Sequence, residues 1–167
     1  MRIYVPATLA MLRQLVSDDS LWPVNGTAFA VTPRLREAYT EGDDEELGEV
    51  ALREAALASL RLLAAAEQSD AMLPPRRAVL VADVGEVTMR PDLDDAVVRI
   101  GEPVPIDDVV AAFVDNAAAE ADVRAAIAVI DEADLGDEDA ELTVGDAQDH
   151  DLAWYATQEL PFLLELL

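Results

Sequence analysis

The stretch DDEELGEVALREAALASLRLLAAAEQ, residues 43–68, decides how this chain folds. Four acidic residues open it and complement the positive end of a helix dipole, and Asp43 and Glu46 have capping-box spacing. Outside a polar stripe of Glu46, Glu49 and Arg53, nearly every later residue is Ala, Leu or Val. The stretch therefore predicts one long and largely buried helix around which the other elements pack.

Working outward, the segment AVLVADV, Ala78–Val84, is almost entirely apolar, which is typical of a central strand covered on both faces. We expect Leu57, Leu60, Val79 and Val81 of these two segments to be buried. Short β-branched and aromatic runs predict further strands at Arg2–Val5, Thr27–Val31, Ala96–Ile100, Val109–Asp115 and Leu142–Val144. Further helices are expected at Leu9–Val16, from Thr32 to about Gly42, from about Asn116 to Ile130, and at Asp149–Leu167.

This order of elements predicts the α/β class in its mixed α+β form. We expect a single globular domain over residues 1–167, with a mixed sheet of five to six strands. About five helices should pack on one or both faces of that sheet.

The formal net charge of −24 restricts the partners of this chain, since 35 Asp and Glu residues stand against 11 Arg and no Lys. Non-specific DNA or RNA binding requires an excess of basic residues, so we expect no direct nucleic-acid partner. The same charge disfavours an anionic membrane surface. A basic or apolar protein partner remains open, and so does the interpretation that the acidity is only a solvated surface.

Cysteine is absent, which excludes disulfides, thiolate metal sites and a cysteine nucleophile. The first residues, MRIYVPATLAMLRQL, lack the pattern of a signal peptide, and the sequence predicts a cytoplasmic protein. No glycine-rich phosphate loop or serine nucleophile motif is present, so we expect no cofactor. The acidic runs lack calcium-loop spacing and are interpreted as solvated loops without a metal. Arg76 and Arg77 are expected to neutralise nearby carboxylates.

The most informative candidate site lies in the expected C-terminal helix. Helical spacing places His150, Trp154 and Gln158 on one face. The adjoining candidates are Asp149, Asp151 and Tyr155. The only His of the chain beside an aromatic wall would suit general acid–base chemistry, but the alternative is that the aromatic residues pack at the edge of the core.

Four segments carry a resemblance to a known group: RIYVPATLAMLRQL, GTAFAVTPRLREAY, RPDLDDAVVRI and DHDLAWYATQELPFLLELL. Over nearly its whole length the chain resembles an uncharacterised protein family of actinobacteria. The resemblance implies a bacterial, cytosolic, single-domain protein. It implies no activity, cofactor or catalytic residue.

Two classes of function remain open, and whether the protein is an enzyme is not decided by its sequence. The first is a protein-interaction module that docks a partner through its acidic surface or through the apolar tail Phe162–Leu167. The second is a small enzyme or small-molecule-binding protein with a pocket near His150, Trp154 and Gln158. A concave, partly apolar pocket around those side chains would favour the second class.

Overall fold

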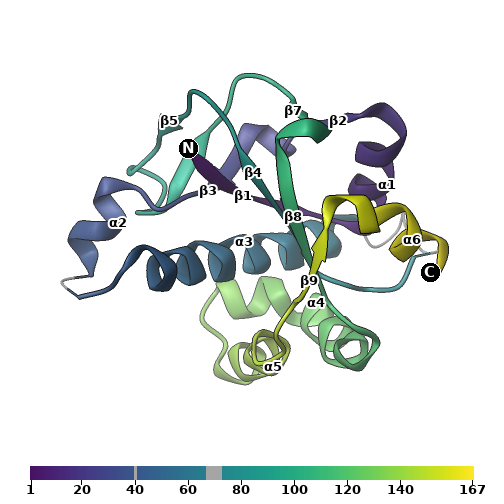
Figure 1. Ribbon diagram of the computed structural model, residues 1–167. Coiled ribbons are helices and arrows are strands. Elements are labelled where there is room, and N and C mark those ends of the chain that lie inside the picture. Colours follow the sequence, from purple (N-terminus) through teal and green to yellow (C-terminus); the bar gives the residue numbers. More distant parts are fainter. Residues whose placement is uncertain (40, 67–72) are drawn as a thin grey trace.

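The computed structural model describes residues 1–39, 41–66 and 73–167 (Figure 1). Its strands are β1 (Arg2–Ala7), β2 (Ser20–Leu21), β3 (Thr27–Phe29), β4 (Ala78–Asp83), β5 (Thr88–Met89), β6 (Val97–Arg99), β7 (Val104–Pro105), β8 (Val109–Val114) and β9 (Ala153–Ala156). Within the described residues, seven strands form one sheet in the order β5-β6-β3-β1-β4-β8-β9. Every neighbouring pair is antiparallel, and β2 pairs separately with β7. The mixed α+β class is confirmed.

The expected sheet was wrong in two respects. It was predicted to be mixed with five to six strands, whereas the described residues give seven antiparallel strands and a separate pair. Strands of two residues, such as β5, are too short to show a period-2 pattern in the sequence. β1 and β3 are antiparallel neighbours, with Tyr4 paired to Phe29. The segment that connects them therefore leaves the sheet and returns to it at the same end.

The described helices are α1 (Leu9–Asp18), α2 (Pro33–Ala38), α3 (Asp44–Ala66), α4 (Glu120–Asp134), α5 (Glu138–Gln148) and α6 (Leu160–Glu165). Short 3-10 turns are η1 (Val24–Gly26), η2 (Ile106–Asp108), η3 (Ala117–Ala119) and η4 (Thr157–Glu159). Several begin at side-chain caps: the Thr8, Thr32 and Asn116 side chains accept backbone N–H bonds. None of the helices in the described ranges is both long and apolar enough to cross a membrane.

Helix α3 lies across one face of the sheet and takes the central position predicted for it (Figure 1). Ser59 ties it to two strands, because its hydroxyl donates to the Ala7 carbonyl at 2.7 Å and accepts from the Ala78 N–H at 3.0 Å. Leu60, Val79 and Val81 are buried as expected, while Leu57 is partly exposed.

The two faces of the sheet belong to different apolar clusters. Helices α1 and α6 cover the first face, where Val5 and Leu80 point. Helix α3 covers part of the second face, where Phe29 and Val79 point. A third cluster, around Ile130, joins α3 to α4 and α5 on the side of α3 away from the sheet (Figure 1).

The C-terminal segment corrects the sequence-based prediction most strongly. A helix was expected over Asp149–Leu167, but β9 pairs along β8 and only α6 is helical. A strand fits better because β8 would otherwise be the sheet edge, and alternation turns Tyr155 toward the apolar cluster of the first face and Trp154 toward the other face. The expected strand at Leu142–Val144 was also wrong: it lies in α5, where Ala140, Val144 and Ala147 repeat at helical spacing against the third cluster.

Candidate functional site

The six candidate residues do not share a helix face, and only two of them, Trp154 and Tyr155, lie in a strand. Trp154 and Tyr155 are neighbours on β9, so their side chains leave opposite faces of the sheet. Tyr155 is partly buried against the cluster that contains α1 and α6. Trp154 is 58% exposed on the face that α3 only partly covers. The predicted grouping of His150, Trp154 and Gln158 on one face was therefore wrong.

The other candidates separate in the same way. Gln158 is exposed in η4, beyond the end of β9. Asp149, His150 and Asp151 lie in the connection between α5 and β9, and all three line one hollow. The structure thus keeps these three residues together, places Trp154 in an adjoining groove and leaves Tyr155 and Gln158 outside both.

Trp154 sits beside a second aromatic residue because of strand register. It pairs directly with Phe113 on β8, and both side chains point to the α3 side. The Asp115 N–H donates to the Arg77 carbonyl, so by alternation the Phe113 N–H points toward β4 and away from β9. Phe113 and Trp154 are consequently a non-hydrogen-bonded pair, the arrangement that brings opposite side chains closest.

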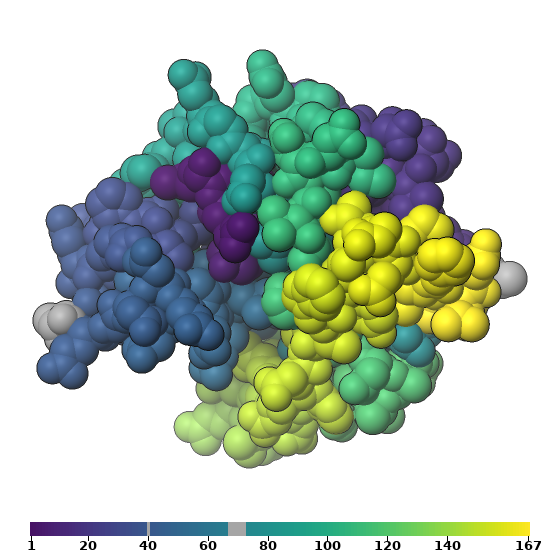
Figure 2. All heavy atoms as spheres, viewed as in Figure 1, coloured from purple at the N-terminus to yellow at the C-terminus, as the bar shows by residue number. Residues whose placement is uncertain are grey.

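Phe113 and Trp154 form one wall of a groove of about 700 Å³ between the sheet and α3. We name it the aromatic groove, because Tyr4, Phe113 and Trp154 line it together with Leu52. Figure 2 shows its two sides on one face of the molecule, the beginning of α3 in blue and the C-terminal segment in yellow. Helix α3 approaches closely at Gly48, where an added Cβ would lie 2.9 Å from the Tyr4 hydroxyl oxygen. Burial raises the pKa of that hydroxyl.

The second concavity, of about 630 Å³, adjoins the first because both are lined by Glu49 and Leu52. We name it the His150 hollow. It is lined by Glu49, Leu52, Arg53, Ala56, Arg77, Gln148, Asp149, His150, Asp151 and Leu152. Most of these side chains are charged or polar, unlike the largely apolar lining of typical small-molecule pockets.

A buried ion pair holds the floor of the His150 hollow in place. The Arg77 guanidinium donates to both carboxylate oxygens of Asp115 at 2.8 Å, and the two side chains are 3% and 0% exposed. The Arg77 Nη2 also donates to the His150 carbonyl at 2.9 Å. Arg76 pairs with Glu120 at 3.0 Å. These contacts confirm that both arginines neutralise carboxylates, but the sequence did not indicate which ones.

The His150 ring is fixed from the side of α4. Its Nε2 lies 2.7 Å from Asp122 Oδ2, and the two side chains are 30% and 47% exposed. Backbone and ring of His150 are therefore both held, the first by Arg77 and the second by Asp122. No three His, Asp or Glu residues among those described are grouped closely enough to hold a metal ion.

The two concavities carry an excess of negative charge. Asp44 on the groove rim is paired with Arg36 at 2.6 Å, and Arg2 is paired with Asp83. In the described part of the chain, no arginine lies within ion-pair distance of four other lining carboxylates. These are Glu45, Glu49, Asp149 and Asp151. Arg53, a positively charged residue that lines the His150 hollow, also has no ion pair among the described residues.

The model of DUF6912, a family of unknown function, matches residues 1–164. The chain belongs to this family. No curated protein and no solved structure matches it. The expected resemblance to an uncharacterised family is thereby confirmed, and membership adds no residue roles to those read from the geometry.

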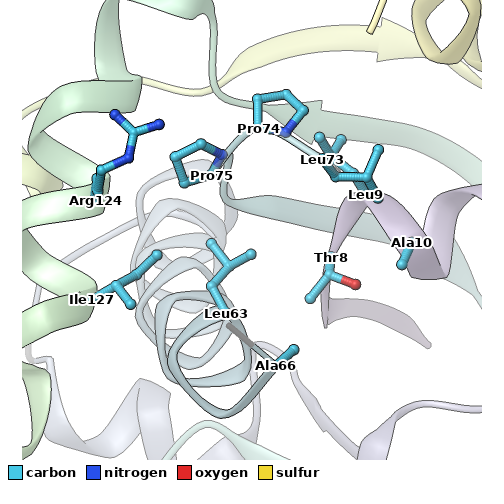
Figure 3. A pocket seen from close by; sticks show the side chains of 10 residues that line it. All are labelled: Thr8, Leu9, Ala10, Leu63, Ala66, Leu73, Pro74, Pro75, Arg124 and Ile127. Atoms are coloured by element: carbon cyan, nitrogen blue, oxygen red, sulfur yellow. The ribbon is translucent and has the colours of Figure 1, made fainter. Parts of the chain in front are cut away.

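A smaller hollow of about 200 Å³ lies between α1, α3 and α4 (Figure 3). Leu9, Leu63 and Ile127 give it an apolar lining, and Arg124 stands at its side. Sequence reasoning missed it, because its walls come from three segments far apart in the chain. Glu120, four residues before Arg124 on α4, pairs with Arg76.

Proposed function

We propose that this protein is a protein-interaction module whose aromatic groove binds a basic segment of another protein. The observation that carries the proposal is Trp154, which is 58% exposed beside Phe113. It lines the same groove as Glu45 and Glu49, which have no ion-pair partner among the described residues. Trp is enriched among the few interface residues that carry most of the binding energy.

The chemistry of the groove favours Arg or Lys in the partner. A cation over an indole face gains roughly 0.5–1 kcal/mol at exposed sites and more when it loses water. Glu45, Glu49, Asp149 and Asp151 add attraction for the same cation and repel anionic partners. Direct nucleic-acid or anionic-membrane binding is accordingly not part of the proposal.

The C-terminal tail offers a weaker docking surface for an apolar partner. Leu163 and Leu164 are buried against the first face of the sheet, so half of this apolar run fills the core. Phe162 and Leu166 are 69% and 85% exposed. Two exposed side chains on a short helix give little area for docking, and we place the binding surface at the aromatic groove.

Isothermal titration with two synthetic peptides tests the proposal. Ac-RTRTRTRT-NH2 should bind the wild-type protein and Ac-ETETETET-NH2 should not. Trp154→Ala should weaken binding of the arginine peptide by about tenfold or more. Trp22→Ala is the matched control, since Trp22 is 55% exposed and lines neither concavity. Equal losses in the two variants, or no binding of the arginine peptide, would contradict the proposal.

The second candidate function is small-molecule binding, including enzymatic use, in the His150 hollow. The observation that favours it is the His150–Asp122 contact at 2.7 Å, which orients the imidazole beside a concavity that also contains Asp149 and Asp151. A base oriented by a carboxylate suits general acid–base chemistry. Mass spectrometry of metabolites released from purified protein tests it: a compound retained by Trp154→Ala and lost from His150→Ala would support this function.

The remaining parts of the proposal concern context. We propose an actinobacterial and cytoplasmic protein that works as one domain over residues 1–167 and needs no cofactor. The absence of both Lys and Cys is consistent with a GC-rich genome and a reducing compartment. Localisation of a tagged chain in an actinobacterial cell would check the compartment, and a single cooperative unfolding transition would check the domain count.

A further inference from the structure

We propose that the partner segment binds as an added antiparallel strand on the outer edge of β9, with a basic side chain over Trp154. This inference rests on the proposed function and specifies its binding mode. Strand addition uses backbone hydrogen bonds for affinity and alternate side chains for specificity.

The outer edge of β9 offers a position for an added strand. β9 is the last strand of the sheet order, and no strand of residues 1–39, 41–66 or 73–167 pairs with its outer side. The opposite sheet edge, β5, is only two residues long, Thr88–Met89. An unpaired strand edge is a template for pairing with another chain.

Strand alternation identifies which groups the edge presents. The even-numbered residues of β8 direct their N–H groups toward β9, so Ala153 and Tyr155 use theirs within the sheet. Trp154 lies between them, and its N–H and C=O point outward. The Ala156 N–H, which also points outward, is taken by the Glu159 carboxylate at 3.0 Å. The exposed part of the edge is therefore centred on Trp154.

The same geometry places the partner's side chains. In an antiparallel pair, the residue opposite Trp154 exchanges both backbone bonds with it and projects its side chain to the same face. That face is the α3 side, above the aromatic groove. An Arg or Lys at this position lies beside the indole, and the neighbour two residues away that faces Leu152 reaches toward the His150 hollow, where Asp149 and Asp151 lie.

Charge identifies the occupant as a basic segment of another protein. A second copy of this chain would bring another net charge of −24 to the same edge, and like charges in contact are strongly unfavourable. A cationic strand meets complementary charge at Glu49, Asp149 and Asp151. The edge strand itself, Ala153–Ala156, carries no charged side chain that would repel an approaching backbone.

Two methylated versions of Ac-RTRTRTRT-NH2 test the binding mode, each with four N-methyl groups. In the antiparallel arrangement the residues whose side chains face the groove also use their N–H groups toward β9. Methylation at the arginines should therefore weaken binding by about tenfold or more, the effect of losing one to two hydrogen bonds. Methylation at the threonines, whose N–H groups point away from β9, should leave the affinity within about twofold of the parent.

Each outcome separates this inference from the proposed function. Equal affinity of the parent and both methylated peptides overturns strand addition and leaves the interaction module standing. A selective loss on threonine methylation overturns the antiparallel arrangement. Failure of the unmethylated peptide to bind contradicts the proposed function itself. In the bound state the Trp154 amide should also exchange with solvent at least about tenfold more slowly, while the Phe113 amide, already within the sheet, keeps its rate.

Discussion

The two faces of the seven-stranded sheet differ in how far helices cover them. On the first face, α1 and α6 extend over β8 and β9, and Leu160 of α6 is fully buried. On the second face, α3 covers β1, β3 and β4, but Phe113 and Trp154 at the β8–β9 end remain partly or mostly exposed. One strand, β9, therefore contributes Tyr155 to a closed core and Trp154 to an open groove.

Under the proposed function, this difference separates stability from recognition within one chain. Residues on the closed side, and the buried pair beneath the His150 hollow, hold the C-terminal segment in place. Residues on the open side contribute little packing and are available to a partner. The expected effects of substitution therefore fall steeply from the closed side to the open side.

The largest loss of stability is expected from breaking the buried Arg77–Asp115 pair. Asp115→Ala leaves a guanidinium that is 3% exposed without its carboxylate, which typically costs about 3–5 kcal/mol. Urea unfolding measures the change in the free energy of unfolding. Arg61→Ala, which removes a pair whose members are 48% and 43% exposed, is the control and should cost far less. Similar losses in both variants would show that the buried pair does not anchor this segment.

Truncation within α6 compares a buried and an exposed leucine of the same C-terminal segment. Leu160→Ala removes a side chain that is 0% exposed under the first face and should cost about 2–5 kcal/mol. Leu166→Ala removes one that is 85% exposed and should change stability by less than about 0.5 kcal/mol. Chemical unfolding of the two variants checks the difference. Equal values would mean that α6 does not close the first face.

The sequence predicted the long helix and the central strand well because their patterns are long and uninterrupted. Asp44–Ala66 spans several turns with one polar stripe, and Ala78–Asp83 is apolar on both sides. These features depend only on neighbouring residues. The caps at Thr8 and Thr32 were predictable for the same local reason.

The C-terminal site was predicted only in part because its conformation depends on a distant segment. AWYA is compatible with either a helix or a strand, and the edge of β8 selects the strand. The sequence placed Asp149, His150 and Asp151 together, but it could not bring Asp122 to the His150 ring or Phe113 to Trp154. Those neighbours are set by the sheet order and by the packing of α4.

A smaller, pH-dependent effect is expected on the α3 side. Burial, followed by the nearby charge of Asp94, raises the pKa of Glu54 above its ordinary value of 4.5. A carboxyl group whose pKa is higher in the folded state destabilises the fold once it ionises, so stability falls as pH rises through that window. Glu54→Gln should therefore stabilise the protein at pH 7 by less than about 1 kcal/mol.

Unfolding measured across pH tests this prediction. Well below the ordinary pKa of 4.5 the wild-type carboxyl is protonated in both the folded and the unfolded state, and the gain from Glu54→Gln should disappear. A gain that persists unchanged in acid would show that burial of the ionised Glu54 is not its cause.

A modest loss of stability is expected at Trp154, the residue on which the proposed binding depends most. Trp154 is 58% exposed, so Trp154→Ala removes less than half the area that a fully buried Trp would lose and should cost about 2 kcal/mol or less. Its neighbour Tyr155 packs against the closed face, and Tyr155→Ala should cost more. Chemical unfolding of both variants gives the free energy of unfolding, and titration with the arginine peptide gives the affinity. The two measurements together compare the two sides of β9 in stability and in binding. If Trp154→Ala costs about 3–5 kcal/mol, the usual range for a buried aromatic residue, the open groove is part of the core and the separation of the two faces fails.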